Sequence, residues 1–336
     1  MITRTGTSKF YPFLVYSYCP LISSIKSLLL RPGFIELCEQ WRQSTSTDPS
    51  LLCDVYDGKV WQSFMTFGGE VFLAQQGSFA FILNIDWFQP FKHQTYSIGA
   101  MYLAIMNLPR NIRYKRENTI ILGLIPGPSE PSLSIDTYLT PHISDLLSLW
   151  QGISLESHDG SKHTIRGALL CVACDLPARR KVCGFLSYNA NLGCSRCYCE
   201  FGTGVFGHND YSGFNRGSWR FRSNNDHRED VKKIRKCATK TARQKAESDY
   251  GCRDSCLLQL PYFDPVMMLI IHPMHNLYQG TAKSIFNKVW REQGFIADTA
   301  ITEINKRISS LTVPPNVRFS SLSPRIQNIS SPPNKL

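Results

Sequence analysis

The chain has 336 residues, of which 43% are hydrophobic, 12% aromatic and 19% charged. These values are typical of a globular protein and exclude both a small disulfide-rich protein and a wholly disordered chain. The net charge of +11 favours a polyanionic partner, nucleic acid before a membrane surface. The sequence has no run of ~20 apolar residues, so it predicts a soluble protein with no membrane partner.

Twelve cysteines are spread along the chain and do not form the dense framework of a small secreted domain. Cys171, Cys174 and Cys183 each stand alone in an apolar run, where a buried, reduced thiol is the expected state. The cysteine pattern therefore predicts a reducing compartment.

Residues 1–64 are expected to form a helical lead-in. Helical spacing of apolar residues covers 21–30 and 33–42, and a polar linker follows at 44–50. Trp41 and Trp61 are interpreted as packing residues, because large aromatic side chains mostly serve cores and interfaces.

An unbroken apolar run at 79–85 predicts a strand buried on both faces, and it ends in one carboxylate, Asp86. An acid at the end of a buried strand is a candidate metal ligand. The alternative is that Asp86 caps the turn leading to Pro90, since Asp favours turns through local hydrogen bonds.

Further strands are expected at 96–107 and 119–125, followed by a helix over 134–155. A fourth strand, 166–173, runs into a second single acid, Asp175, and Pro177 stops it. Three strands, a helix and a fourth strand, with acids after the first and fourth, are typical of a ribonuclease H-like α/β core. That fold would bring Asp86 and Asp175 side by side.

Two close carboxylates repel each other unless a cation neutralises them, and oxygen ligands of this type suit Mg²⁺ or Mn²⁺. Paired metal ions can activate an attacking oxygen and stabilise the leaving oxygen in phosphodiester cleavage and strand transfer. The acid pair therefore predicts this chemistry, which usually takes a third carboxylate as well.

Two basic segments are candidates for DNA contact, with a solvated helix face as the alternative for each. The first follows Asp175 and contributes Arg179, Arg180 and Lys181. The second, 216–245, carries eleven Lys or Arg against three acids, with Trp219 and Phe221 at its start for stacking on a base. Its candidate DNA-binding residues are Arg220, Arg222, Lys232, Lys233, Arg235 and Lys236.

A C-x-x-C pair, Cys194 and Cys197, is compatible with zinc ligation, a redox pair or chance, and a zinc site needs two more ligands. His272 and His275 are the other compact candidates, although their spacing differs from that of a usual zinc finger. We expect the chain to divide into a lead-in (1–64), a ribonuclease H-like core (65–192), a Cys-rich basic insertion (193–260), a helical return to the core (261–312) and a disordered tail (313–336).

With these residues in view, the chain resembles the transposases of CACTA-type (En/Spm-like) DNA transposons, particularly the fungal branch called Plavaka. The matching phrases include RPGFIELCEQWR, DVYDGKVW, NIDWFQPFK, CDLPARRKVCGF with GCSRC, and LPYFDP followed by HPMHNLYQGTAKSIF. The resemblance spans residues 31–295. It implies a nuclear DDE transposase whose first two acids are Asp86 and Asp175 and which acts on transposon ends and target DNA. Partners would be DNA, a second copy or a transposon-encoded accessory protein.

The resemblance also implies a zinc element that combines Cys194 and Cys197 with a downstream Asp-x-x-His, where this chain has His272 in place of the Asp and His275 as the His. Relatives continue past the end of this chain, and the third catalytic acid is expected in that continuation. Glu292, Asp298 and Glu303 are late acids that do not match the family's third-acid region. We therefore expect a C-terminally truncated, inactive chain.

Two other interpretations compete with a DNA transposase. The chain could be a DNA-binding remnant without catalysis, which uses its basic segment and a zinc-organised fold. It could also be a decayed reading frame that does not fold by itself.

Overall fold

The computed structural model describes residues 15–43, 51–132, 134–200, 203 and 215–310, so the expected linker at 44–50 and the tail at 313–336 lie outside the described residues. The chain forms two compact units, Met1–Ile270 and Ile271–Leu336. The division falls inside the expected return to the core at 261–312. Within the described residues, no helix is both long enough and apolar enough to span a bilayer.

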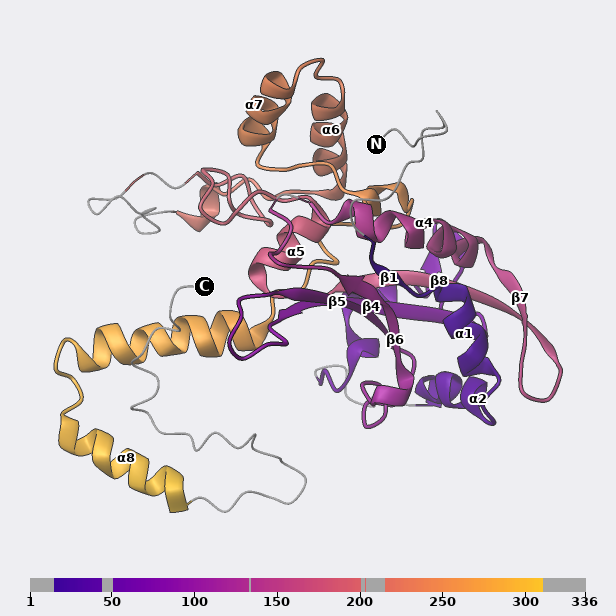
Figure 1. Ribbon diagram of the computed structural model, residues 1–336, viewed down its shortest axis with the longest axis horizontal. Coiled ribbons are helices and arrows are strands. Elements are labelled where there is room, and N and C mark those ends of the chain that lie inside the picture. The colour runs from indigo at the N-terminus through magenta and orange to yellow at the C-terminus, as the bar shows by residue number, and fades with distance from the viewer. Residues whose placement is uncertain (1–14, 44–50, 133, 201–202, 204–214, 311–336) are drawn as a thin grey trace, which may run out of the picture. The chain divides into compact units, whose positions relative to one another are not determined.

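The first unit is built on a mixed sheet of six strands (Figure 1). All neighbouring strands are antiparallel except β4 and β8, which run parallel. In spatial order the strands are β1 (Ser17–Tyr18), β6 (Thr119–Ile125), β5 (Ile98–Ile105), β4 (Ser78–Phe88), β8 (Lys162–Val172) and β7 (Ile153–Glu156).

Strand β4 lies in the interior of the sheet because its sequence suits burial on both faces. Phe79, Phe81, Leu83 and Ile85 are at most 2% exposed. The strand pairs with β5 along one edge and β8 along the other. The apolar run that predicted this strand is therefore confirmed, and β4 continues through Asp86 to Phe88.

Helices α1 (Leu21–Leu29) and α4 (Asp136–Gln151) pack against the sheet and against each other (Figure 1). The sequence predicted a helix that continues to Leu155, which is wrong. Gly152, with a φ of 101°, ends α4, and residues 153–156 alternate between half-buried and exposed in strand β7. A left-handed backbone at glycine stops a helix at little steric cost.

Short elements complete the first half of this unit. They are α2 (Phe34–Glu39), η1 (Gln40–Gln43), η2 (Val55–Asp57), α3 (Lys59–Ser63), β2 (Thr66–Phe67), β3 (Glu70–Val71) and η3 (Arg116–Asn118). Trp41 and Trp61 are 8% and 2% exposed, with ring centroids 4.8 Å apart, and Tyr56 packs on both. Both tryptophans therefore pack in the core, as predicted.

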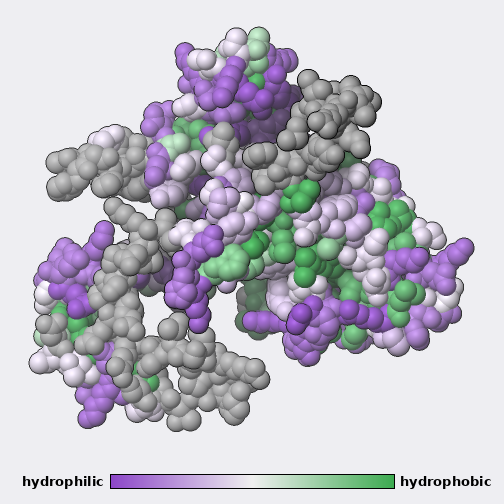
Figure 2. All heavy atoms as spheres, in the orientation of Figure 1, coloured by the Kyte–Doolittle hydropathy of each residue, from purple (hydrophilic) through white to green (hydrophobic). Residues whose placement is uncertain are grey.

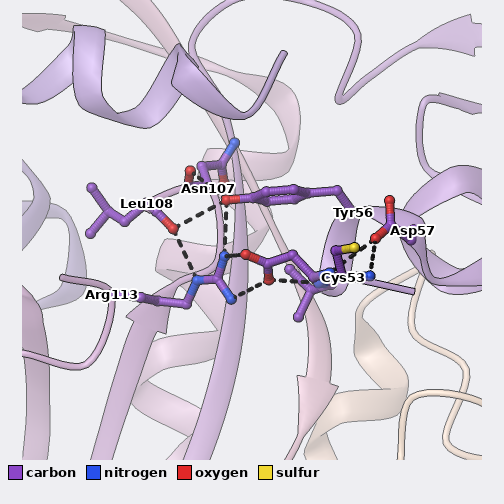
Figure 3. Close-up of polar contacts among 8 residues, drawn as sticks. Cys53, Tyr56, Asp57, Asn107, Leu108 and Arg113 are labelled. Atoms are coloured by element: carbon purple, nitrogen blue, oxygen red, sulfur yellow. Dashed lines mark hydrogen bonds and ion pairs between the residues drawn. The ribbon is translucent and has the colours of Figure 1, made fainter. Parts of the chain in front are cut away.

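A buried cation ties η2 to the loop after β5 (Figure 3). The Arg113 guanidinium, 2% exposed, donates to both carboxylate oxygens of Asp54 at 2.7 and 2.9 Å. It also donates to the Leu108 carbonyl at 3.0 Å and to the Tyr56 hydroxyl at 2.9 Å. Asn107 extends the connection to β4, since its side chain accepts from the Ala80 N–H.

The rest of the first unit consists of α5 (Leu176–Cys183), η4 (Arg216–Ser218), α6 (Asn224–Arg235), α7 (Lys240–Tyr250) and η5 (Cys256–Gln259). Residues 266–270 then run parallel to the end of β8. The Val172 N–H donates to the Met268 carbonyl at 2.9 Å, and the Ile270 N–H donates to the Val172 carbonyl at 3.0 Å. This pairing places a short extended segment beside the C-terminal end of β8.

The described part of the second unit is mainly helical. It contains the wide, π-type turns η6 (Met274–Ala282) and η7 (Ile285–Arg291), followed by α8 (Asp298–Ser310).

The Arg113 contacts predict a strong effect of a conservative change. Asp54→Asn keeps the shape of the side chain but leaves a buried guanidinium without its counter-ion, so we expect a loss of about 3 kcal/mol or more in the free energy of unfolding, measured in urea. The control is Glu229→Gln, which removes one partner of the exposed Lys232–Glu229 pair and should leave the midpoint unchanged. Equal midpoints for the two variants would contradict a stabilising role of the Asp54 carboxylate.

Candidate functional site

The two predicted acids lie near the C-terminal ends of two neighbouring parallel strands. Leu83 of β4 pairs with Val172 of β8, and the Ala173 N–H donates to the Leu83 carbonyl at 2.8 Å. Asp86 and Asp175 each lie three residues beyond this Leu83–Val172 pair. The carboxyl ends of parallel strands meet at one edge of a sheet, so both acids lie at the same edge.

Cys174 lies next to both carboxylates. Its thiol accepts from the Ile85 N–H at 3.2 Å and is 1% exposed. Burial, together with the smaller effect of the negative charges of Asp175 and Asp86, raises the pKa of Cys174 to about 12, although the hydrogen bond from the Ile85 N–H acts in the opposite direction. The charges of both acids therefore influence one buried thiol, which stays protonated at neutral pH.

The two acids have different local roles. Asp175 is half-buried and caps α5, where its Oδ1 accepts from the Ala178 N–H at 2.8 Å. Asp86 is exposed within β4, opposite Ala100 of β5, and does not stand at the turn to Pro90. Among the described residues, no hydrogen-bond donor to the Asp86 carboxylate is found.

The basic residues after Asp175 mainly support the fold. Arg179 and Arg180 are 6% and 7% exposed, and their guanidiniums donate to the carbonyls of Ile270 and Leu186. Lys181 pairs with Glu130 at 3.0 Å. DNA contact by these three residues stays a prediction.

The second basic segment separates into one buried and several exposed cations. Arg222 is 4% exposed and donates to the carbonyls of Cys194, Cys197, Tyr250 and Leu192. The exposed basic side chains lie around and on α6, in a part of the surface that Figure 2 shows as hydrophilic. They include Arg220, Lys232, Lys233 and Arg235, paired with Asp226, Glu229, Asp230 and Asp254, and also Lys236.

The C-x-x-C segment gathers three thiols. The Cys194 sulfur accepts from the Arg196 N–H at 3.3 Å. Burial raises the pKa of Cys197 to about 11, with further upward contributions from Cys194 and Cys199, while a hydrogen bond from the Cys199 backbone acts in the opposite direction. Backbone N–H donors of this kind favour the thiolate, the form that ligates zinc.

His272 and His275 lie in the second unit, where their ring centroids are 4.8 Å apart. In the part of the chain that the structure describes, no group of three or more His, Cys, Asp or Glu side chains is arranged to hold a metal ion. That the two histidines and the two cysteines share one zinc ion stays a prediction.

A comparison with known protein families shows to which family the chain belongs. The sequence model of the transposase family tnp2 matches residues 50–248, which is more than half of the chain. The chain belongs to the transposase family tnp2. The tnp2 match contains Asp86, Asp175, Cys194 and Cys197, whereas His272 lies beyond it. A search among curated proteins finds no match.

Sequence reasoning missed three residues around the tnp2 candidate sites. Cys174 stands one position before Asp175 and Cys199 two positions after Cys197, which was the available signal. Arg196 lies inside the C-x-x-C segment, and its guanidinium donates to the Val266 and Leu269 carbonyls, thereby linking this segment to 266–270. Nothing in the local sequence indicated that link.

The raised pKa of Cys197 predicts its reactivity in chelator-treated protein. Below its pKa, the thiolate fraction rises tenfold per pH unit, so alkylation of Cys197 by iodoacetamide should keep accelerating from pH 8 to about 11. Peptide mass spectrometry measures the rate, and the exposed Cys53 is expected to react first. A Cys197 rate that levels off near pH 8.5, about the ordinary thiol pKa, would contradict the buried, protonated thiol.

Proposed function

We propose that this tnp2 protein derives from a CACTA-type DNA transposase and that Asp86 and Asp175 hold Mg²⁺ or Mn²⁺ at a nuclease centre. The observation that carries the proposal is that each acid lies three residues beyond the paired residues Leu83 and Val172 of the parallel strands β4 and β8. A family of transposases implies DNA as the partner.

The sheet order supports a ribonuclease H-like core for this proposal. Strands β6, β5 and β4 form an antiparallel meander, β8 adds in parallel beside β4, and residues 266–270 run parallel beside the end of β8. The first acid lies near the C-terminal end of the first strand of the meander, and the second acid follows β8. This is the order expected from the sequence of a ribonuclease H-like protein.

The donor set at this edge fits a hard divalent cation. Asp86 is exposed, and Asp175 uses its Oδ1 for the helix cap, so oxygen atoms from both carboxylates are available to a cation. When bound, the metal would stabilise charge on the attacking and leaving oxygens of a phosphodiester. The two acids would hold and orient it, first for cleavage at a transposon end and then for strand transfer.

The surface of α6 favours a second function, DNA binding without catalysis. Lys232, Lys233 and Arg235 are 48–62% exposed in their side chains and project from one short helix. The cations themselves are solvent-accessible, and the partner of Lys232, Glu229, is exposed as well, so phosphates can compete for these cations. A nuclear location and assembly with a second copy or an accessory protein belong to both proposals.

For zinc, we propose Cys194 and Cys197 as ligands. The support is chemical: two thiols in a C-x-x-C segment, with an N–H donor to each sulfur.

The acid pair predicts shared metal binding. Calorimetric titration with Mn²⁺ should show binding to the wild-type chain that both Asp86→Asn and Asp175→Asn reduce at least tenfold, because each removes one charged ligand. Asn at 175 retains an oxygen for the α5 cap, so the helix is preserved. Asp159→Asn, in the β7–β8 turn, is the matched control. Binding that survives both changes would sink the nuclease proposal and leave DNA binding as the function.

Zinc content tests the cysteine site separately. Protein purified without chelators should carry one zinc ion per chain, and Cys194→Ser should lower this content because a thiolate ligand is lost. Cys53→Ser, which changes an exposed cysteine, is the control. Full zinc content in Cys194→Ser, or metal-free wild-type protein, would reject the site.

A further inference from the structure

A hollow of about 580 Å³ lies within the first unit, beside the C-x-x-C segment. Neither Asp86 nor Asp175 is among the described residues that line it. Its volume is in the range of small-molecule sites in proteins. It is lined by Arg196, Trp219, Phe221, Arg222, Val266 and Met267.

Two apolar side chains stand exposed at this hollow. Phe221 and Met267 are 56% and 53% exposed, although nearby side chains such as Val266 are buried. The backbone around Phe221 is nevertheless fixed, because it pairs with Cys197 in a β-bridge. The Arg222 N–H donates to the Arg196 carbonyl at 2.9 Å, and the Tyr198 N–H donates to the Arg220 carbonyl at 2.9 Å. The Phe221 ring is thus presented on a rigid support.

Arg196 contributes a fixed planar cation to the same hollow. Its guanidinium donates to the Leu269 carbonyl at 2.7 Å and to the Val266 carbonyl. The acid that influences it, Asp264, is already engaged, since its Oδ1 accepts from the N–H groups of Val266 and Met267 at 2.8 and 3.0 Å. A guanidinium held flat in this way can stack on, and donate to, a planar polar ring.

We propose that this hollow receives an unpaired nucleobase of DNA, stacked on Phe221 beside the Arg196 guanidinium. The inference rests on the DNA partner of the proposed function and adds a distinct base-binding site to it. Charge favours this occupant over an apolar peptide or a second copy: the described lining residues include the half-buried cation of Arg196 and no acid. Arg220, with a side chain 71% exposed, is the neighbour of Phe221 and can meet the adjoining phosphate.

The test compares two labelled duplexes that differ at one position, a bulged thymine in one and an abasic site at the same bulge in the other. Fluorescence anisotropy at fixed salt measures both affinities. The wild-type chain should bind the thymine duplex about 5- to 100-fold more tightly, the range for one stacked base. Phe221→Ala should abolish this preference and Phe221→Tyr should retain it, while affinity for a fully paired duplex and its salt dependence stay unchanged.

Two further variants guard against a trivial effect. Met267→Glu places a negative charge at the hollow and should also abolish the preference. Tyr114→Ala removes another exposed aromatic ring, 60% exposed, between β5 and β6 and should leave the preference intact. A bulged 2-aminopurine gives an independent signal, since its fluorescence should be quenched by the wild-type chain and not by Phe221→Ala.

The outcomes separate this site from the wider function. Paired-duplex binding without a thymine preference, or a preference that survives in Phe221→Ala, overturns the base site and leaves DNA binding in place. Failure to bind any DNA at low salt overturns both. Dissociation of an oligomer by Phe221→Ala, seen in sedimentation, would identify a second copy as the occupant and overturn the base site.

Discussion

The parallel pairing of β4 with β8 is the constraint on which the candidate centre depends. Parallel neighbours need a long crossover, and here β5, β6, α4 and β7 supply it. Because the two strands point the same way, their C-terminal ends reach the same edge, where Asp86 lies near the end of β4 and Asp175 follows β8. The pairing of Leu83 with Val172 places both acids three residues further along, at this edge.

Buried and half-buried arginines hold much of the irregular part of the first unit together. Arg113, Arg180 and Arg222 are buried and Arg196 is half-buried, and each donates to backbone carbonyls of irregular segments. The guanidinium suits this role because it offers five donors in a fixed plane. Some of the basic residues therefore stabilise the fold, and only the exposed ones are available to bind a polyanion.

The same arrangement links the cysteine segment to the core. Arg222 donates to carbonyls at both ends of the C-x-x-C segment. Arg196 connects that segment with residues 266–270 beside β8. The proposed base site lies where these links meet. In the proposed function, the two acids would hold the metal ion at the phosphodiester. The α6 surface would bind the DNA backbone, and the hollow would bind an unpaired base.

The order of strands and helices, the buried character of β4 and the identity of the two acids followed from the sequence, because hydrophobic periodicity and a single acid after an apolar run are local signals. The end of α4 at Gly152 and the strand β7 were missed, because residues 153–155 remain apolar enough to continue a helical pattern. Tertiary structure alone decided which arginines are buried. The sequence has the same residue type at Arg220 and Arg222, yet one side chain is exposed and the other is 4% exposed and bonded to four carbonyls. A cation's exposure depends on the carbonyls that distant segments leave unpaired, and no local pattern records them.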